Sequence, residues 1–269
     1  MTIKIISFNI WDLPLWFVKD REKRFKGLIN YLKKLDADII CLQEAFDPQN
    51  RKKLVEELGG IYETTNDISN NRKIFGLKLF DKSGGLVIFS KFKILESAFV
   101  PHNRLANSTI GEVFGRKGYL RATIKTPAGN LEVINIHLHE EGIWFADRII
   151  RRNQLAQILK QVNNIDKPSI LLGDFNQFDL IKRNDFINLL KTNDFFHADQ
   201  EENLAASYRQ ENIYFNGLFN NPSGSVRLDY VFIRKLDMLN LEVKDYHVEI
   251  LEPSLSDHDP VILTLCQNI

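Results

Sequence analysis

Short apolar runs alternate with longer stretches of helical spacing along this chain of 269 residues. The first run, KIISFNI, has the composition of a strand and ends at Asn9 and Ile10. Apolar residues then recur every three or four positions, which predicts an amphipathic helix over 20–35. The continuous apolar run 39–42 follows, and such a run suits a strand covered on both faces. The chain therefore begins with a predicted strand, helix and buried strand.

The same alternation continues to the end of the chain. Further helices are expected near 48–58, over 145–164 and near 183–193. The remaining strands are expected at 61–65, 85–90, 94–100, 119–126, 131–138, 169–172, 228–234, 242–250 and 260–265. Between the last helix and about residue 225 the chain is polar, and we expect irregular structure there.

Strand–helix–strand units occur in both halves of the chain, and each half also carries hairpin-like strand pairs. The layer arrangement that buries all these apolar faces is two sheets packed face to face, each covered by helices. No repeat and no linker divides the sequence. We therefore predict an α/β sandwich that forms one domain over 1–269.

Polar side chains that could bind a metal or transfer a proton lie where many of the predicted strands end or begin. They are Asn9, Glu44, His137, Asp174, Asn176, Asp229 and the string Ser256-Asp257-His258-Asp259-Pro260, which precedes the apolar run VILTL. A globular domain has no folding reason to place so many carboxylates, amides and imidazoles at strand ends. Metal-assisted hydrolysis of a phosphodiester gives the pattern a reason.

Three of these side chains suit a metal site, and two suit an acid–base pair. Hard cations such as Mg²⁺ favour oxygen ligands, so we predict Glu44 as the anchoring ligand, with Asn9 and Asp257 beside it. We predict His258 as the general base, because imidazole is well matched to proton transfer near neutral pH. Asp229 is predicted to fix the tautomer of that histidine.

The strand that ends in IHLH and the GDFN string supply three further catalytic candidates. Period-two alternation places His137 on the same strand face as Asn135 and His139. His137 is predicted either to stabilise the transition state or to protonate the leaving group. Asp174 is predicted to orient the attacking water, and Asn176 to donate to a phosphoryl oxygen. The structural alternatives are a hydrogen-bonded interior histidine and an ordinary Gly-Asp turn.

Composition excludes little. The 35 basic and 35 acidic residues give a net charge of zero, which argues weakly against a dedicated nucleic-acid binder, because such proteins usually carry a basic excess. The first ten residues lack the features of a signal peptide. No run approaches the roughly 18 apolar residues of a membrane span. We expect a soluble, cytoplasmic monomer.

The order of the polar residues resembles that of the endonuclease/exonuclease/phosphatase superfamily, whose prototype is the pancreatic-type deoxyribonuclease. The resemblance runs from about Ile5 to Leu265. It implies a four-layer α/β/β/α sandwich of two mixed sheets. It also implies dependence on Mg²⁺, with Mn²⁺ as the alternative, and cleavage of a phosphodiester or phosphomonoester.

Within the superfamily, several strings are similar to those of the neutral sphingomyelinases: FNIWDLP, GGLVIFSK, GRKGYL and NIHLHEE. This resemblance implies a sphingomyelinase-like phospholipase C that cleaves a phospholipid headgroup. It implies Glu44 as the magnesium ligand and His137 and His258 as the catalytic histidines. Lys117 would lie in a loop that is tied to activity.

Aromatic residues in two loops bear on a lipid substrate. Trp11 follows the first strand and Trp144 follows the histidine strand, so both are expected at the catalytic end of the sandwich. We predict that they contact the substrate or a peripheral membrane surface. The alternative is that they pack against neighbouring rings and helices.

Other functions stay open at this stage. The same core chemistry serves an endonuclease or exonuclease acting on DNA. A phosphoinositide phosphatase fits less well, because GDFN continues with Gln177 and Phe178 where Tyr-Arg is usual. A binding module without catalysis fits less well again, because every expected catalytic position holds a chemically competent residue.

Overall fold

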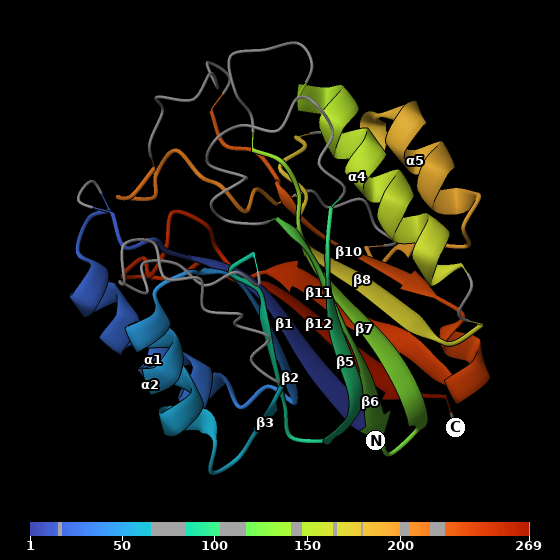
Figure 1. Cartoon of the computed structure of the whole chain (residues 1–269), viewed down its shortest axis with the longest axis horizontal. Coiled ribbons are helices and arrows are strands. Elements are labelled where there is room, and N and C mark those ends of the chain that lie inside the picture. The colour runs from blue at the N-terminus through green and yellow to red at the C-terminus, as the bar shows by residue number, and fades with distance from the viewer. Residues whose placement is uncertain are drawn as a thin grey trace.

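Two six-stranded sheets pack face to face, and helices cover both outer faces (Figure 1). The computed structural model describes residues 1–15, 18–65, 84–102, 117–140, 147–163, 166–178, 180–199, 205–215 and 224–268. The arrangement confirms the predicted four-layer α/β/β/α sandwich of two mixed sheets.

The first sheet has the strand order β11-β12-β1-β2-β4-β3. Its parallel pair is β1 (Thr2–Asp12) and β2 (Ile39–Ala45), which α1 (Arg21–Leu35) connects. The antiparallel strands are β3 (Glu63–Thr64), β4 (Val87–Ser90), β11 (Leu241–Val248) and β12 (Val261–Gln267). The outer face of this sheet is covered by α1 and α2 (Pro48–Leu58) (Figure 1).

The second sheet repeats this plan with the order β5-β6-β7-β8-β10-β9. Its parallel pair is β7 (Gly129–His137) and β8 (Ser169–Asp174), which α4 (Asp147–Val162) connects. The antiparallel strands are β5 (Lys93–Pro101), β6 (Gly118–Thr126), β9 (Phe196–His197) and β10 (Asp229–Arg234). The helices α4 and α5 (Asn184–Lys191) cover its outer face, and the short 3₁₀ helices are Leu180–Lys182 and Leu236–Leu239.

Three apolar layers hold the four structural layers together. Ile5 and Cys41 of the first sheet meet Val133 and Leu172 of the second sheet in the central layer. A second layer joins α1 and α2 to the first sheet, and a third joins α4 and α5 to the second sheet. Each parallel strand therefore buries both faces, which explains why the run 39–42 is continuously apolar and why Ile39–Ala45 is buried along its whole length.

Most predicted elements are confirmed, and the differences are in strand ends and in one short edge strand. The predicted strand 61–65 is reduced to Glu63–Thr64, and the strand 85–90 begins at Val87. Within the segment expected to be irregular, Phe196 and His197 form the edge strand β9. A strand of two residues is too short to show periodicity. It is formed by pairing with a strand 35 residues away, as in the pair Phe232–His197, so the local sequence does not indicate it. Among the described residues, none of the helices is long and apolar enough to cross a membrane.

Candidate active site

The topology brings the polar strand ends to one edge of the sandwich. The parallel strands β1 and β2, and likewise β7 and β8, end on the same side, while the antiparallel β10 begins there. In the strand register, His137 and Asp229 both pair with Asp174, so the three residues form one row across the second sheet. Asn9 and Glu44 approach this row from the first sheet.

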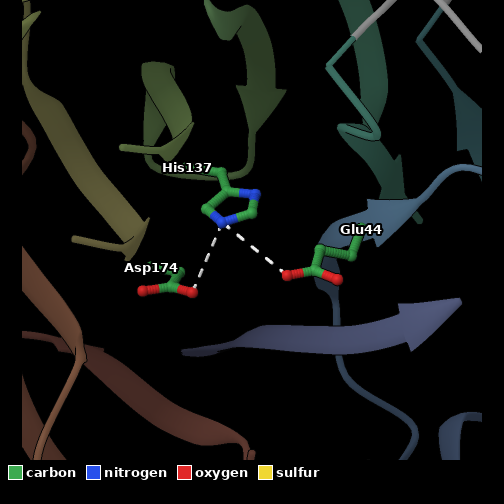
Figure 2. Close-up of side chains that lie close together, drawn as sticks. All are labelled: Glu44, His137 and Asp174. Atoms are coloured by element: carbon green, nitrogen blue, oxygen red, sulfur yellow. Dashed lines mark ion pairs between the residues drawn. The ribbon is translucent and has the colours of Figure 1, made fainter. Parts of the chain in front are cut away.

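Four side chains from four strands form a buried cluster. The amide nitrogen of Asn9 donates to Oε1 of Glu44 and to Oδ2 of Asp174, each at 3.0 Å. Nε2 of His137 lies 3.7 Å from the same glutamate oxygen and 3.6 Å from the same aspartate oxygen (Figure 2). The two carboxylates therefore face one imidazole nitrogen, and Asn9 ties them to each other.

A second group of residues adjoins this cluster through Asp174. Nδ1 of His258 lies 2.8 Å from Oδ2 of Asp229, and its Nε2 lies 3.8 Å from Oδ2 of Asp174. The pair joins the two sheets, because Asp229 begins β10 and His258 precedes β12. The sequence-predicted aspartate–histidine partnership is thus present in the structure.

Two amine or amide groups converge on the carbonyl oxygen of Leu138. The ammonium of Lys117 donates to this oxygen at 2.7 Å, and the side-chain nitrogen of Asn176 does so at 3.2 Å. Lys117 also lies 3.2 Å from Nε2 of His137 and 3.1 Å from Oε1 of Glu140. A buried cation therefore stands beside the cluster of carboxylates.

Burial makes the charged state of the carboxylates unfavourable. Desolvation raises the pKa of Glu44 to about 8, and repulsion from Glu140 and Asp257 adds to this rise. Desolvation likewise raises the pKa of Asp174 to about 6, with Asp229 contributing in the same direction. A group of buried acids of this kind becomes more stable when a cation binds among them.

The two histidines of the site shift in opposite directions. Burial lowers the pKa of His137 well below its usual value, and the positive charge of Lys117 lowers it further. Burial would lower the pKa of His258 as well, but the charges of Asp229 and Asp174 outweigh it and raise this pKa well above the usual value.

The donor set fits a hard divalent cation. Glu44, His137 and Asp174 each offer one ligand atom, and these atoms lie within 4.8 Å of one another. The buried oxygen Oε2 of Glu44 has no hydrogen-bond partner among the described residues, so this atom is available to a ligand. Carboxylate oxygens are the ligands that Mg²⁺ prefers. A second set of the same kind consists of Asp174, Asp229 and His258.

The backbone is bent into unusual conformations at several of these positions. Trp11, Glu44 and Asn176 have positive φ angles of 47°, 56° and 49°. Such conformations are costly for residues other than glycine and cluster at functional sites. Gly173 precedes Asp174 with φ 137°, and a Cβ atom there would lie 2.0 Å from the carbonyl oxygen of Ile136. Only glycine lets β8 carry its terminal aspartate this close to β7.

The other predicted site residues have varied surroundings. The carboxylate of Asp257 accepts from the hydroxyl of Ser256 at 3.1 Å and is 9% exposed. The carbonyl oxygen of Asn9 accepts from the backbone of Trp11. The Trp11 ring is half-buried, with the guanidinium of Arg24 at 4.8 Å. The metal-ligand roles of Asp257 and Asn9 and the substrate role of Trp11 stay predictions, and Trp144 lies outside the described residues.

Asn135 and His139, the polar residues that alternate with His137, contact other parts of the structure. Asn135 shares the face of His137, but it accepts from Gln43 at 2.7 Å and donates to Leu42 at 2.9 Å, which joins the two sheets behind the site. His139 lies beyond the end of the strand and meets Asp147 of α4 at 3.0 Å. Sequence reasoning gave Gln43 no role, because a glutamine beside a candidate glutamate has no distinguishing pattern.

Residues 6–258 match the sequence model of the Endonuclease/Exonuclease/phosphatase family, which covers most of the chain and includes every described site residue. The chain belongs to this family.

Curated relatives carry sphingomyelinase names. The chain is 28% identical to Sphingomyelinase C 2 of Leptospira interrogans over 87% of this chain and 39% of that protein. It is 24% identical to Sphingomyelin phosphodiesterase 2 of Mus musculus over 98% of this chain and 65% of that protein. The chain thus spans less than two thirds of the length of these relatives.

Solved structures that share this fold include a bacterial toxin and a protein bound to DNA. The beta toxin of Staphylococcus aureus, in a mutant form with bound magnesium ions, has a TM-score of 0.72 at 20% identity, with 100% of both chains covered. TDP2 of D. rerio, complexed with a single-strand DNA product, has a TM-score of 0.71 at 19% identity, with 99% of both chains covered. The fold by itself therefore does not identify the substrate.

Proposed function

We propose that this chain is a metal-dependent phosphoric diester hydrolase. The observation that carries the proposal is the meeting of buried carboxylates and an aspartate–histidine pair around Asp174. Carboxylates that burial holds at a raised pKa need a cation, and a paired imidazole supplies proton transfer. The family supports the same reaction class.

In the proposed reaction His258 accepts a proton from the attacking water. Asp229 holds Nδ1 of this imidazole, so Nε2 is the nitrogen that faces the reacting group. Asp174 lies 3.8 Å from Nε2 and would orient the same water molecule. A fixed tautomer and a fixed water direction are the conditions for general-base catalysis.

His137 acts as a hydrogen-bonding group toward the phosphoryl oxygens in this proposal. Its lowered pKa favours the neutral imidazole, which argues for stabilisation of the transition state over proton donation. Lys117 adds positive charge beside His137. Asn176 lies close to Lys117, because both side chains donate to the carbonyl oxygen of Leu138. Positive and hydrogen-bonding groups stabilise charge that develops on a phosphoryl centre.

The metal of this proposal is Mg²⁺. Glu44 would hold it through the oxygen that has no partner among the described residues, with Asp174 beside it and Asn9 and Asp257 completing the predicted set. When bound, the cation would neutralise phosphoryl charge and polarise the phosphodiester. Mn²⁺, which also accepts oxygen ligands, is the alternative metal.

We propose a phospholipid headgroup as the substrate, so the enzyme would act as a sphingomyelinase-like phospholipase C. The sphingomyelinase names of the curated relatives support this choice over DNA, as does the net charge of zero. Trp11 and Trp144 would then contact the lipid interface or the substrate.

The test compares substrates and metals with one purified protein. Sphingomyelin in detergent micelles, nicked and abasic DNA, and a chromogenic phosphodiester are each assayed with Mg²⁺, with Mn²⁺ and with EDTA. We expect hydrolysis of sphingomyelin with Mg²⁺ and its loss in EDTA. Faster hydrolysis of DNA than of lipid would contradict the substrate proposal, and full activity in EDTA would contradict the metal.

A matched pair of variants tests the metal ligand. Glu44→Gln removes the charge of the anchoring carboxylate. The control, Glu132→Gln, changes a buried glutamate on β7 that lies outside the cluster and accepts from Thr123 at 2.6 Å. We expect the first variant to need a much higher Mg²⁺ concentration and the second to keep the wild-type requirement. Equal metal dependence in both would contradict the assignment.

A further inference from the structure

The segment 205–215 connects the two halves of the aspartate–histidine pair. One side of this segment contacts the chain that leads into β10, where Asp229 begins the strand. The other side contacts the chain that leads into β12, where His258 lies. Asp229 begins a strand of the second sheet and His258 lies just before a strand of the first sheet, so an element that contacts both can set their relative position.

Ser207 makes the central contacts of this segment and is 0% exposed. Its hydroxyl oxygen accepts from the backbone amides of Leu228 at 3.0 Å and Asp229 at 3.1 Å. Its carbonyl oxygen accepts from the backbone amide of Asp259 at 2.7 Å. One residue therefore holds the backbone of Asp229 through its side chain and the backbone beside His258 through its main chain.

The neighbours of Ser207 reinforce the connection. Tyr208 pairs with Val226 on one side and with His258 on the other, and its ring lies 5.3 Å from the His258 ring. The guanidinium of Arg209 donates to the buried carboxylate of Asp259 at 2.5 Å. Asn212 donates to the carbonyl oxygen of Ser256 at 2.9 Å. Successive residues thus contact the segments before β10 and before β12.

We propose that Ser207 is a positioning residue for the reaction, which fixes the Asp229 carboxylate against His258. The inference rests on the proposed hydrolase activity for its catalytic meaning. The hydrogen bonds of Ser207 are present without substrate, so they can be tested separately from activity. A hydroxyl that accepts from the buried amide of Asp229 and the partly buried amide of Leu228 restrains the backbone at the start of β10, because the Asp229 amide would otherwise lack a partner. A small displacement of a catalytic group is enough to slow a reaction.

Ser207→Ala is the first test, because it removes the hydroxyl and keeps the carbonyl that holds Asp259. Only the Asp229 side of the connection is loosened. We expect kcat for the chromogenic phosphodiester to fall by about 10- to 100-fold, with KM changed by less than about threefold. A wild-type kcat in this variant would overturn the proposal.

A double-variant comparison separates positioning from general loosening. In an Asp229→Asn background, Ser207→Ala should cost less than about threefold in kcat, because the carboxylate that it positions is already gone. If the loss is the same in both backgrounds, Ser207 does not act through Asp229 and the proposal is wrong.

The matched control is Ser90→Ala. Ser90 is also 0% exposed, and its hydroxyl accepts from the amide of Phe92 at 3.0 Å at the opposite end of the sandwich. We expect this variant to lose thermal stability without loss of kcat. If it lowers kcat as far as Ser207→Ala does, the effect at Ser207 is a stability effect and the proposal is wrong.

Amide hydrogen exchange tests the positioning without any substrate. In Ser207→Ala the amides of Leu228 and Asp229 should exchange faster, while the amide of Asp259 keeps its protection. Unchanged exchange at Leu228 and Asp229 would overturn the proposal, whatever the enzyme cleaves. If the Leu228 and Asp229 amides exchange faster as expected but the wild-type protein hydrolyses no phosphodiester, the proposed function is wrong while the contacts of Ser207 are confirmed.

Ser207→Cys is the second variant and decides the question if the alanine variant does not fold. It keeps the size of the side chain but offers a weaker acceptor. We expect the same changes in kcat and exchange, to a smaller degree. A folded cysteine variant with wild-type kcat and exchange would overturn the proposal.

Discussion

His137 and His258 occupy the same edge of the sandwich, yet their surroundings give them opposite character. Both are buried, and both lie near Oδ2 of Asp174, at 3.6 Å and 3.8 Å. The nearest charged group to His137 is the Lys117 ammonium, at 3.2 Å, whereas His258 has the Asp229 carboxylate at 2.8 Å. The pKa of the first is lowered and that of the second is raised. Equal burial therefore does not give equal chemistry.

The difference assigns the two histidines to different tasks. A neutral imidazole beside a lysine suits hydrogen bonding to a phosphoryl oxygen, and an imidazole held by a carboxylate suits proton transfer. The raised pKa of His258 favours its protonated form. A cation bound among the carboxylates would offset their charge and lower this pKa, which couples metal binding to the activity of the base.

Removing the proposed base should have the largest effect. His258→Ala is expected to lower kcat by roughly 10²–10⁴, because it removes the imidazole that accepts the proton of the attacking water. Steady-state rates on the chromogenic phosphodiester measure this loss. The control is His197→Phe, since His197 packs against Tyr230 and Phe232 away from the cluster. Near-normal rates in His258→Ala would refute the assignment of the base.

Removing the partner carboxylate should change both the rate and its pH dependence. Asp229→Asn is expected to lower kcat by about 100-fold through loss of the fixed tautomer. Asp229 raises the pKa of His258, so its removal lowers that pKa. The fall of kcat on the acid side should therefore move to lower pH. A shift to higher pH would show that another group controls this limb.

Removing the charge of Lys117 should raise the pKa of His137 toward that of His258. Lys117→Met eliminates a positive charge that lowers the pKa of His137, so this pKa should rise. NMR titration of the imidazole measures the rise, and kcat is expected to fall about tenfold. Lys91→Met, at a lysine that pairs with Asp36, is the control. An unchanged pKa of His137 would mean that burial alone depresses it.

The smallest effect on activity is expected at His197, a partly buried histidine of the edge strand β9. Burial lowers the pKa of His197 from 6.5 to about 4, so the folded state favours its neutral form. Its contribution to stability is present above the unfolded value of 6.5 and is lost as the pH falls through the folded value of about 4.

His197→Phe removes this titration and should leave kcat unchanged near neutral pH. The free energy of unfolding should then depend less on pH across the acid range, by up to roughly 3 kcal/mol. Urea unfolding at a series of pH values measures it. The same acid sensitivity in the variant and the wild type would place the loss at another group.

Local pattern predicted much of the fold, because the buried strands are continuous apolar runs and the long helices repeat apolar residues every three or four positions. Ile39–Ala45 and Ser169–Asp174 are buried along their whole length, and the two long helices follow the expected spacing. The edge strand Phe196–His197 escaped prediction because it exists only through pairing with β10.

The amino-acid sequence alone determined which chemical groups stand at the strand ends, since the apolar runs stop at Asn9, Glu44, His137 and Asp174 whatever surrounds them. Only the tertiary structure decided which of these groups meet, because strand pairing and sheet packing set distances between residues far apart in the chain. It lowered the pKa of His137 and raised that of His258, because each pKa depends on neighbours from other strands. It also placed Ser207 between the two catalytic partners, a position that no local pattern around it indicates.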